Sequence, residues 1–150
     1  MSRVIELALE NARTGTGGPF AALVLKEGKI VGTGTNRVTS ANDPTAHAEI
    51  VAIRDACTTL KTFQLTNCEV YSNCEPCPMC MGALYWARPA RIFYAATRND
   101  AADIGFSDAF IYDQLKLRIS DRSLPMLQLM REQALEAFRY WKQKPNKILY

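Results

Sequence analysis

Short apolar segments with strand-like composition alternate with amphipathic helical segments along this 150-residue chain. The strand patterns cover residues 20–26, 30–36, 69–72 and 91–95. The helical patterns cover residues 2–11, 75–87 and 132–142, and a further segment that begins at residue 43. Strands that alternate with crossover helices fold as layers around one sheet. The order predicts a single α/β domain over residues 1–150, built as a three-layer α/β/α sandwich with a mixed central sheet.

Several boundaries depend on turn and capping signals. Asp43 can cap free N–H groups and Pro44 suits the first helical position, so we expect a helix to start there. The polar residues 37–42 before it predict a loop. Nearer the C-terminus, residues 100–112 predict turns with helical pieces. Residues 124–130 predict a last strand, which would lie at a sheet edge because it contains a proline.

Composition and charge exclude several classes of protein. Apolar residues make up 48% of the chain and charged residues 22%, which is typical of a folded globular domain and not of a disordered one. No apolar run approaches the roughly 18 residues of a membrane span, and the first residues lack a secretory signal pattern. The net charge of +3 is mild, so nucleic acid is not an expected partner. We expect a cytoplasmic protein.

The five cysteines and the single histidine carry most of the chemical information. Three of the cysteines lie within residues 74–80, and an odd total is a poor basis for paired disulfides. In a reducing cytosol, this pattern favours metal or redox chemistry. Cys57 and Cys68 lie apart from the group and are expected to be buried small hydrophobes. Any chemistry that needs an imidazole must use His47.

His47, Cys77 and Cys80 form a candidate zinc site. All three lie near the starts of predicted helices, where the positive end of the helix dipole favours thiolate over thiol. Cys77 and Cys80 are three positions apart and share one helix face. Two thiolates and one imidazole suit Zn²⁺, which prefers tetrahedral nitrogen and sulfur ligands. Three protein ligands leave the fourth position to water, whose pKa zinc lowers to about 7.

Glu49 lies two positions after His47 and therefore on a different side of the helix. We expect this carboxylate to transfer protons and not to bind the metal. The pattern H-x-E followed by P-C-x-x-C is the signature of zinc deaminases, in which the glutamate acts as acid and base. The sequence therefore predicts a catalytic zinc site for the hydrolytic removal of an amino group.

Other interpretations of the cysteines are open at this point. A lone C-x-x-C is also typical of a redox pair, and residues 74–80 partly match an iron–sulfur motif that leaves His47 and Glu49 unexplained. A closed structural zinc site would use Cys74 as the fourth ligand. The protein would then be a zinc module without enzymatic activity, in which the metal only holds the fold together.

Beyond the zinc motifs, several short segments match one family pattern: residues 17–22, 42–49, 72–80, 82–89, 94–96, 100–102, 105–106 and 110–112. On these segments the chain resembles the cytidine-deaminase-like superfamily of zinc deaminases, and more closely the small bacterial guanine deaminases. The resemblance is dense between Gly17 and Tyr112 and looser elsewhere. The zinc motifs specify only the superfamily, whereas the region around Asp108 and the terminal Tyr150 favour guanine.

The resemblance implies zinc-dependent hydrolysis of guanine to xanthine and ammonia, with zinc on the three ligands named above and Glu49 as the proton carrier. It also implies a set of residues that bind the purine: Asn36, Asp108, Phe20, Ala48, Trp86 and Tyr150. A carboxylate accepts the ring N–H groups of guanine, an amide both donates and accepts, and aromatic walls suit a flat base.

Each of these residue types also has a structural alternative. Phe20 and Trp86 could instead pack in the hydrophobic core. Asp108 could cap a helix, and Tyr150 could be a frayed chain end.

The family resemblance further implies a homodimer that acts on a small purine base. The C-terminal segment, about residues 131–150, would be exchanged between subunits and would cover the partner's site. Cytosine, cytidine, guanosine or a triazine such as ammeline are the nearest alternative substrates. A tRNA adenosine deaminase would need a basic groove for a flipped base. The basic residues of the C-terminal helix and tail are the candidates for such a groove, and such charges are usually solvated.

Overall fold

A computed structural model describes residues 1–149, and the chain divides into a first unit, Met1–Asp108, and a second unit from Ala109 onward. The apolar alternation of the first unit produces four strands: β1 (Ala21–Lys26), β2 (Lys29–Thr35), β3 (Cys68–Cys74) and β4 (Arg91–Ala96). Their order in the sheet is β2-β1-β3-β4. Strand β1 is antiparallel to both neighbours, whereas β3 and β4 are parallel. The prediction of a mixed sheet is confirmed.

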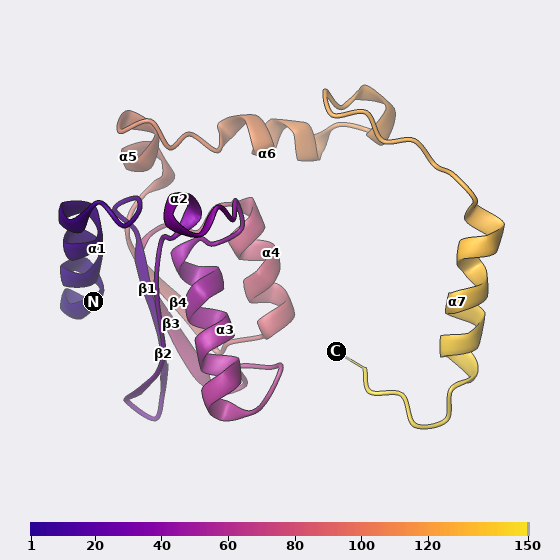
Figure 1. Cartoon of the computed structure of the whole chain (residues 1–150), viewed down its shortest axis with the longest axis horizontal. Coiled ribbons are helices and arrows are strands. Elements are labelled where there is room, and N and C mark those ends of the chain that lie inside the picture. The colour runs from indigo at the N-terminus through magenta and orange to yellow at the C-terminus, as the bar shows by residue number, and fades with distance from the viewer. Residues whose placement is uncertain (150) are drawn as a thin grey trace. The chain divides into compact units, whose positions relative to one another are not determined.

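Helices cover both faces of this sheet (Figure 1). On one face, α1 (Ser2–Thr14) packs Val4 and Ala8 against Ala21 and Leu23 of β1. On the other face lie α3 (Ala48–Leu60) and α4 (Pro78–Ala87). Small alanines of α3 pack there against the alternate residues of β1 and β3, which form the main core. The first unit is therefore the three-layer α/β/α sandwich that the sequence predicts.

The chain between β2 and α3 differs from the prediction. Residues 37–42 are not a plain loop, because they contain the short helix α2 (Val38–Ala41). The expected helix start at Asp43 is also wrong. The Asp43 carboxylate accepts hydrogen bonds from the N–H and the hydroxyl of Thr45, at 2.8 and 2.7 Å. These bonds close a turn, and α3 starts only at Ala48, with His47 as its N-cap residue.

Helix α4 also starts later in the sequence than predicted. The sequence predicts that this helix opens at Glu75-Pro76, but the chain is still extended there because the Glu75 N–H donates to the carbonyl oxygen of Ala96 at 2.8 Å. The helix begins at Pro78, a residue that lacks the N–H which the first turn leaves unpaired. Cys77 is therefore the N-cap residue of α4. Helix α5 (Arg98–Asp103) follows β4 and starts with a capping box between Thr97 and Asp100.

The second unit is helical. It contains α6 (Ala109–Lys116), the 3₁₀ turn η1 (Ile119–Asp121) and α7 (Arg131–Gln143), which matches the predicted C-terminal helix. The strand predicted at residues 124–130 is absent from the described part of this unit. Pro125 has no N–H to donate, and the unit offers no other strand for pairing. Across residues 1–149, no helix is both long enough and apolar enough to cross a membrane.

Gly34 of β2 allows α3 to approach the sheet closely. A Cβ atom at this position would collide with the carbonyl oxygen of Ala48 and the backbone nitrogen of Ala52. Ala48 is the first residue of α3 and directly follows His47. The absence of a side chain at Gly34 therefore sets the position of the helix start that carries His47 and Glu49.

Gly34→Ala is expected to lower the free energy of unfolding by about 1–3 kcal/mol, because the added methyl group forces the helix away from the strand. Gly82→Ala is the matched control, since a Cβ there meets no atom within 4 Å. Gly82 lies inside α4, where alanine should raise the stability by about 0.5–1 kcal/mol. Urea denaturation measures both changes. A Gly34→Ala variant as stable as the natural protein would contradict this packing.

Candidate active site

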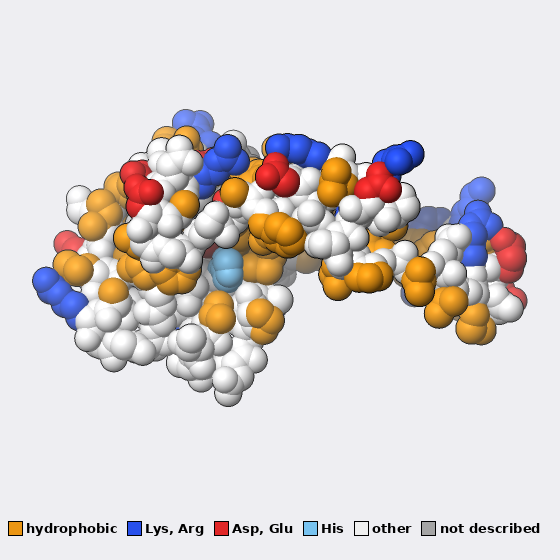
Figure 2. Space-filling view, turned by 90° about the horizontal axis from the view of Figure 1, so that it is seen from above, with side chains coloured by type: hydrophobic (Ala, Val, Ile, Leu, Met, Phe, Trp, Pro, Cys, Tyr) orange, Lys and Arg blue, Asp and Glu red, His pale blue; other side chains and the backbone are white. Residues whose placement is uncertain are grey.

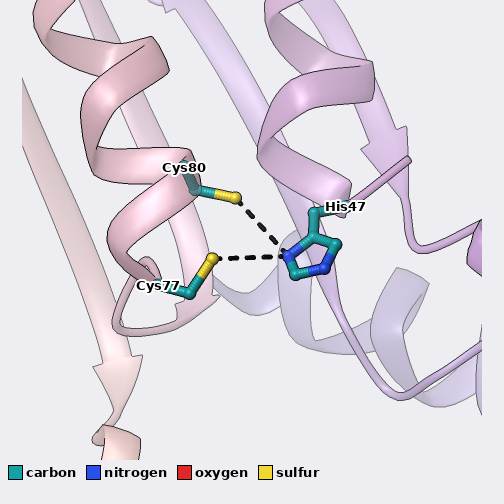
Figure 3. A group of neighbouring side chains, drawn as sticks. All are labelled: His47, Cys77 and Cys80. Carbon is teal, nitrogen blue, oxygen red and sulfur yellow. Dashed lines mark hydrogen bonds between the residues drawn. The ribbon is translucent and has the colours of Figure 1, made fainter. Parts of the chain in front are cut away.

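Three side chains converge where the starts of α3 and α4 meet (Figure 3). His47 is the N-cap residue of α3, Cys77 is the N-cap residue of α4, and Cys80 lies in the first turn of α4. The Nδ1 atom of His47 lies 3.5 Å from the Sγ of Cys77 and 3.6 Å from the Sγ of Cys80. Residues that are 30 or more positions apart in the sequence thus present one nitrogen and two sulfurs to the same point.

The separations of these atoms fit a tetrahedral zinc ion. With metal–sulfur and metal–nitrogen bonds of usual length, a sulfur and a nitrogen ligand of zinc lie about 3.6 Å apart. The observed distances match this value, and the three ligand atoms all lie within 4.8 Å of one another. Cys80 is buried, whereas His47 and Cys77 are half-buried. Figure 2 shows the single histidine, in pale blue, reaching the surface, so solvent has access to the group.

Electrostatics prepare Cys77 for a cation. Hydrogen bonds from Cys80 and from His47 lower the pKa of the Cys77 thiol to about 4, so this group is a thiolate at neutral pH. The same hydrogen bond to Cys77, together with burial, raises the pKa of Cys80. The thiolate of Cys77 also raises the pKa of His47. The negative charge of this group therefore lies on Cys77 at the start of α4, where a divalent cation would be stabilised.

Glu49 lies next to this group and is not part of it. The side chain is 6% exposed, and its Oε2 accepts a hydrogen bond from the Cys80 thiol at 3.4 Å. Its Oε1 accepts a hydrogen bond from the Ser72 hydroxyl at 3.3 Å. Burial raises the pKa of the Glu49 carboxyl, which brings it closer to the range in which a group can both take and give a proton.

The other cysteines lie outside the group of potential ligands. Cys74 is buried on β3, and its thiol donates to the carbonyl oxygen of Thr97 at 3.7 Å. The group with suitable ligand atoms among the described residues contains one histidine and two cysteines, without Cys74. This arrangement speaks against both the closed four-ligand site and the iron–sulfur interpretation. Cys68 is fully buried, as predicted, whereas Cys57 is only half-buried and packs against the core.

The residues predicted to bind the base have different surroundings. Asn36 is buried at the end of β2, and its Oδ1 accepts hydrogen bonds from the N–H groups of Gly18 and Val38 at 3.4 and 3.3 Å. Phe20 is half-buried against the core and forms an edge-to-face ring pair with Phe106, with centroids 4.9 Å apart. Phe20 therefore packs against the core, which is the structural role considered for it above as an alternative to binding the base.

Ala48, Asp108 and Trp86 complete the described part of the set. Ala48 is buried at the first turn of α3. Partial burial raises the pKa of Asp108, and the negative charge of Cys77 raises it further, which places this carboxyl within electrostatic reach of the group. Trp86 is 63% exposed on α4, so core packing is not its role in this unit. The predicted contribution of Tyr150 lies outside the described residues.

Sequence reasoning missed two buried polar residues near the site. Ser72 lies among the buried alternate positions of β3, where an apolar residue is expected. Asn11 lies on the buried stripe of α1, and its Nδ2 donates to the carbonyl oxygens of Gly18 and Asn36 at 2.8 and 3.0 Å. In both cases the signal was a polar residue in a position that the periodicity assigns to the core.

The α/β/α sandwich and the group at its two helix starts define a zinc-dependent deaminase. Residues 1–96 match the family described as the cytidine and deoxycytidylate deaminase zinc-binding region. The chain belongs to this family of zinc-dependent hydrolases.

Guanine deaminases are among the proteins that are similar to this chain over most or all of its length. Guanine deaminase of Bacillus subtilis is 47% identical over 150 residues, which covers 100% of this chain and 96% of that protein. Its X-ray structure has a TM-score of 0.96 and covers 99% of this chain and 95% of that chain. A structure of guanine deaminase from Nitrosomonas europaea has a TM-score of 0.68 and 32% identity, and covers 91% of this chain and 69% of that chain.

Similarity to RNA-modifying members of the family is confined to part of the chain. The tRNA-specific adenosine deaminase of Buchnera aphidicola is 43% identical over 82 residues, which covers 55% of this chain and 54% of that protein.

Proposed function

We propose that this protein hydrolyses guanine to xanthine and ammonia, with zinc held by His47, Cys77 and Cys80 and with Glu49 as the proton carrier. The observation that carries the chemistry is the buried Glu49 carboxylate, whose Oε2 lies 3.4 Å from one of the three ligands. The choice of guanine is supported by relatives named guanine deaminase, one of which matches the whole chain. The similarity to the tRNA deaminase extends over about half of it.

Zinc, when bound, supplies Lewis-acid activation of water at neutral pH. Glu49 then performs the proton transfers. Its Oε2 accepts a proton from the attacking water and delivers it to a ring nitrogen of guanine as the new carbon–oxygen bond forms. The carboxylate then takes the remaining proton of the newly added hydroxyl and passes it to the amino group. The carbon–nitrogen bond breaks as the carbon–oxygen double bond of xanthine forms, and ammonia leaves. The raised pKa of Glu49 favours these proton transfers, because a carboxylate with a raised pKa accepts a proton more readily near neutral pH.

Asn36 is suited to donate to the base. Its Oδ1 already accepts from the backbone N–H groups of Gly18 and Val38, so the amide is oriented with Nδ2 as the remaining polar atom. We propose that Nδ2 donates to an acceptor on the purine. Asn11 stabilises the same loop, because its Nδ2 donates hydrogen bonds to the carbonyl oxygens of Gly18 and Asn36.

Asp108 and the aromatic residues would complete the recognition of guanine. The Asp108 carboxylate can accept the N–H groups on the edge of the base that carries the amino group. Phe20, which forms an edge-to-face pair with Phe106, and Trp86 offer aromatic surfaces for the ring, and Ala48 leaves room beside His47. Tyr150 is proposed as a further residue that binds the substrate.

We propose that the protein acts as a homodimer in the cytoplasm, in which the segment from about residue 131 to residue 150 covers the partner's site. Large apolar side chains of the second unit are highly exposed, including Leu127 at 85% and Phe138 at 68%. Exposed apolar surface of this extent favours association. The first unit offers exposed aromatic residues on β4, among them Tyr94. The five free cysteines agree with a reducing compartment.

The substrate assignment is tested by ammonia release from a panel of bases. Zinc-loaded protein should release ammonia from guanine with kcat/KM at least about 100-fold above the values for cytosine, cytidine, guanosine and ammeline, because a site built around polar partners rejects ligands that leave them unpaired. Formation of xanthine in equal amount confirms the reaction. A higher kcat/KM for any other compound would reassign the substrate and leave the zinc chemistry intact.

A further inference from the structure

A polar side chain interrupts the apolar row that β3 presents to α3 and α4. The row consists of alternate residues of the strand, and Cys68 and Val70 belong to the main core. Ser72 follows them and is only 2% exposed. A hydroxyl in this position needs hydrogen-bond partners, because burial removes it from water.

The partners of Ser72 assign the direction of its hydrogen bonds. The backbone N–H of Cys74 donates to the Ser72 Oγ at 3.4 Å, which occupies a lone pair of that oxygen. The single hydroxyl proton is then free to point at the Oε1 of Glu49, 3.3 Å away. The local turn of the chain at the end of β3 thus orients the Ser72 hydroxyl toward the carboxylate.

The two oxygens of Glu49 therefore have different neighbours. Oε1 faces the sheet and accepts from Ser72, whereas Oε2 faces the ligand group and lies 3.4 Å from the Sγ of Cys80. A cysteine that binds zinc does so as a thiolate and has no proton to donate. When Cys80 binds zinc, its hydrogen bond to the Oε2 of Glu49 is lost. Among the hydrogen bonds of the described residues, the side-chain donor that then remains on the Glu49 carboxylate is the Ser72 hydroxyl.

We propose that Ser72 is a positioning residue, which anchors the Oε1 of Glu49 so that Oε2 stays directed at the reacting atoms. The proposal rests on the proposed function, in which Glu49 carries the protons. Ser72 itself does not touch the substrate. An unanchored carboxylate could rotate about its last side-chain bonds, and even small displacements of a proton-transferring group slow a reaction strongly.

Threonine and valine at position 72 provide the decisive pair of variants, because they have the same shape and differ in the hydroxyl. Both add a methyl group to a buried site, so any packing strain is common to the two. Ser72→Thr should keep kcat for guanine within about threefold of the natural protein. Ser72→Val should lower kcat by roughly 10- to 100-fold, as is typical for the loss of a supporting hydrogen bond. The KM should change by less than about twofold in both.

The zinc content of each variant, measured by atomic emission, should equal that of the natural protein. Equal kcat values for the valine and threonine variants would overturn the proposal. So would a loss in Ser72→Val that appears only in KM or that follows a loss of zinc.

Ser72→Ala is a third variant, which can be studied if threonine or valine at this position prevents folding. The crystal structure of this zinc-loaded variant should show the Glu49 carboxylate turned away from its natural position. An unchanged carboxylate would overturn the proposal without reference to activity. If the natural protein fails to deaminate guanine but deaminates another base of the panel, the proposed substrate is wrong, and the threonine–valine comparison on that base still decides the role of Ser72.

Discussion

Replacing Glu49 with Gln lowers kcat for guanine by roughly 10²- to 10⁴-fold while the zinc content stays at the natural level. This is the expected result because glutamine preserves the shape and the hydrogen-bonding reach of the side chain but cannot carry a proton between water and the base. Glu49 is buried and lies outside the group of potential ligands, so its replacement does not remove a ligand. Steady-state ammonia release and atomic emission measure the two quantities.

Glu10→Gln is the matched control for this experiment. The chemical change is identical, but Glu10 is an exposed residue of α1. Its variant should have the same kcat as the natural protein. A Glu49→Gln variant with full turnover and full zinc content would remove Glu49 from the mechanism. A variant that has lost its zinc would instead indicate that the carboxylate helps to hold the metal.

Cys77→Ala should abolish both zinc binding and deamination. Loss of one of three ligands leaves a histidine and a single thiolate, and structural and catalytic zinc sites in proteins require at least three protein ligands. We expect about one zinc ion per chain in the natural protein and less than about one tenth of that in the variant after dialysis against a chelator. Activity should fall in proportion to the zinc content.

Cys74→Ala is the control that separates the two proposed ligand sets. Cys74 belongs to the same seven-residue segment, but its thiol bonds to the Thr97 carbonyl oxygen and lies outside the group of ligands. This variant should retain its zinc after the same dialysis. Loss of zinc from the Cys74 variant, or its retention by the Cys77 variant, would contradict the ligand set proposed here.

The candidate zinc site could be predicted from the sequence because each half of it is local. Cys77 and Cys80 are brought together by one turn of helix, and Glu49 is held close to His47 by the chain itself. The sequence cannot state the distance between the halves. It indicates only that both begin helices, and the starts of crossover helices meet at one edge of a sheet. The structure brings them together in this way, with His47 and Cys77 as the N-cap residues.

The misplaced elements have physical causes that a local pattern does not contain. Asp43 has the composition of a helix cap, but its carboxylate binds Thr45 and closes a turn instead. Residues 124–130 have the apolar content of a strand but lack a neighbouring strand within their unit. The role of Ser72 depends on contact with Glu49, 23 positions away in the chain. Such a contact exists only after α3 has packed on the sheet.

The two halves of the candidate ligand set also belong to different parts of the sandwich. His47 precedes α3, which packs on the hairpin of β1 and β2, whereas Cys77 follows β3. A metal ion bound by both halves would cross-link the starts of α3 and α4. The folded chain presents all three side chains together, so it would bind such an ion more tightly than the unfolded chain does. The difference in binding free energy would add to the free energy of unfolding. Metal starvation in the cell would therefore expose this protein to proteolysis as well as silence it.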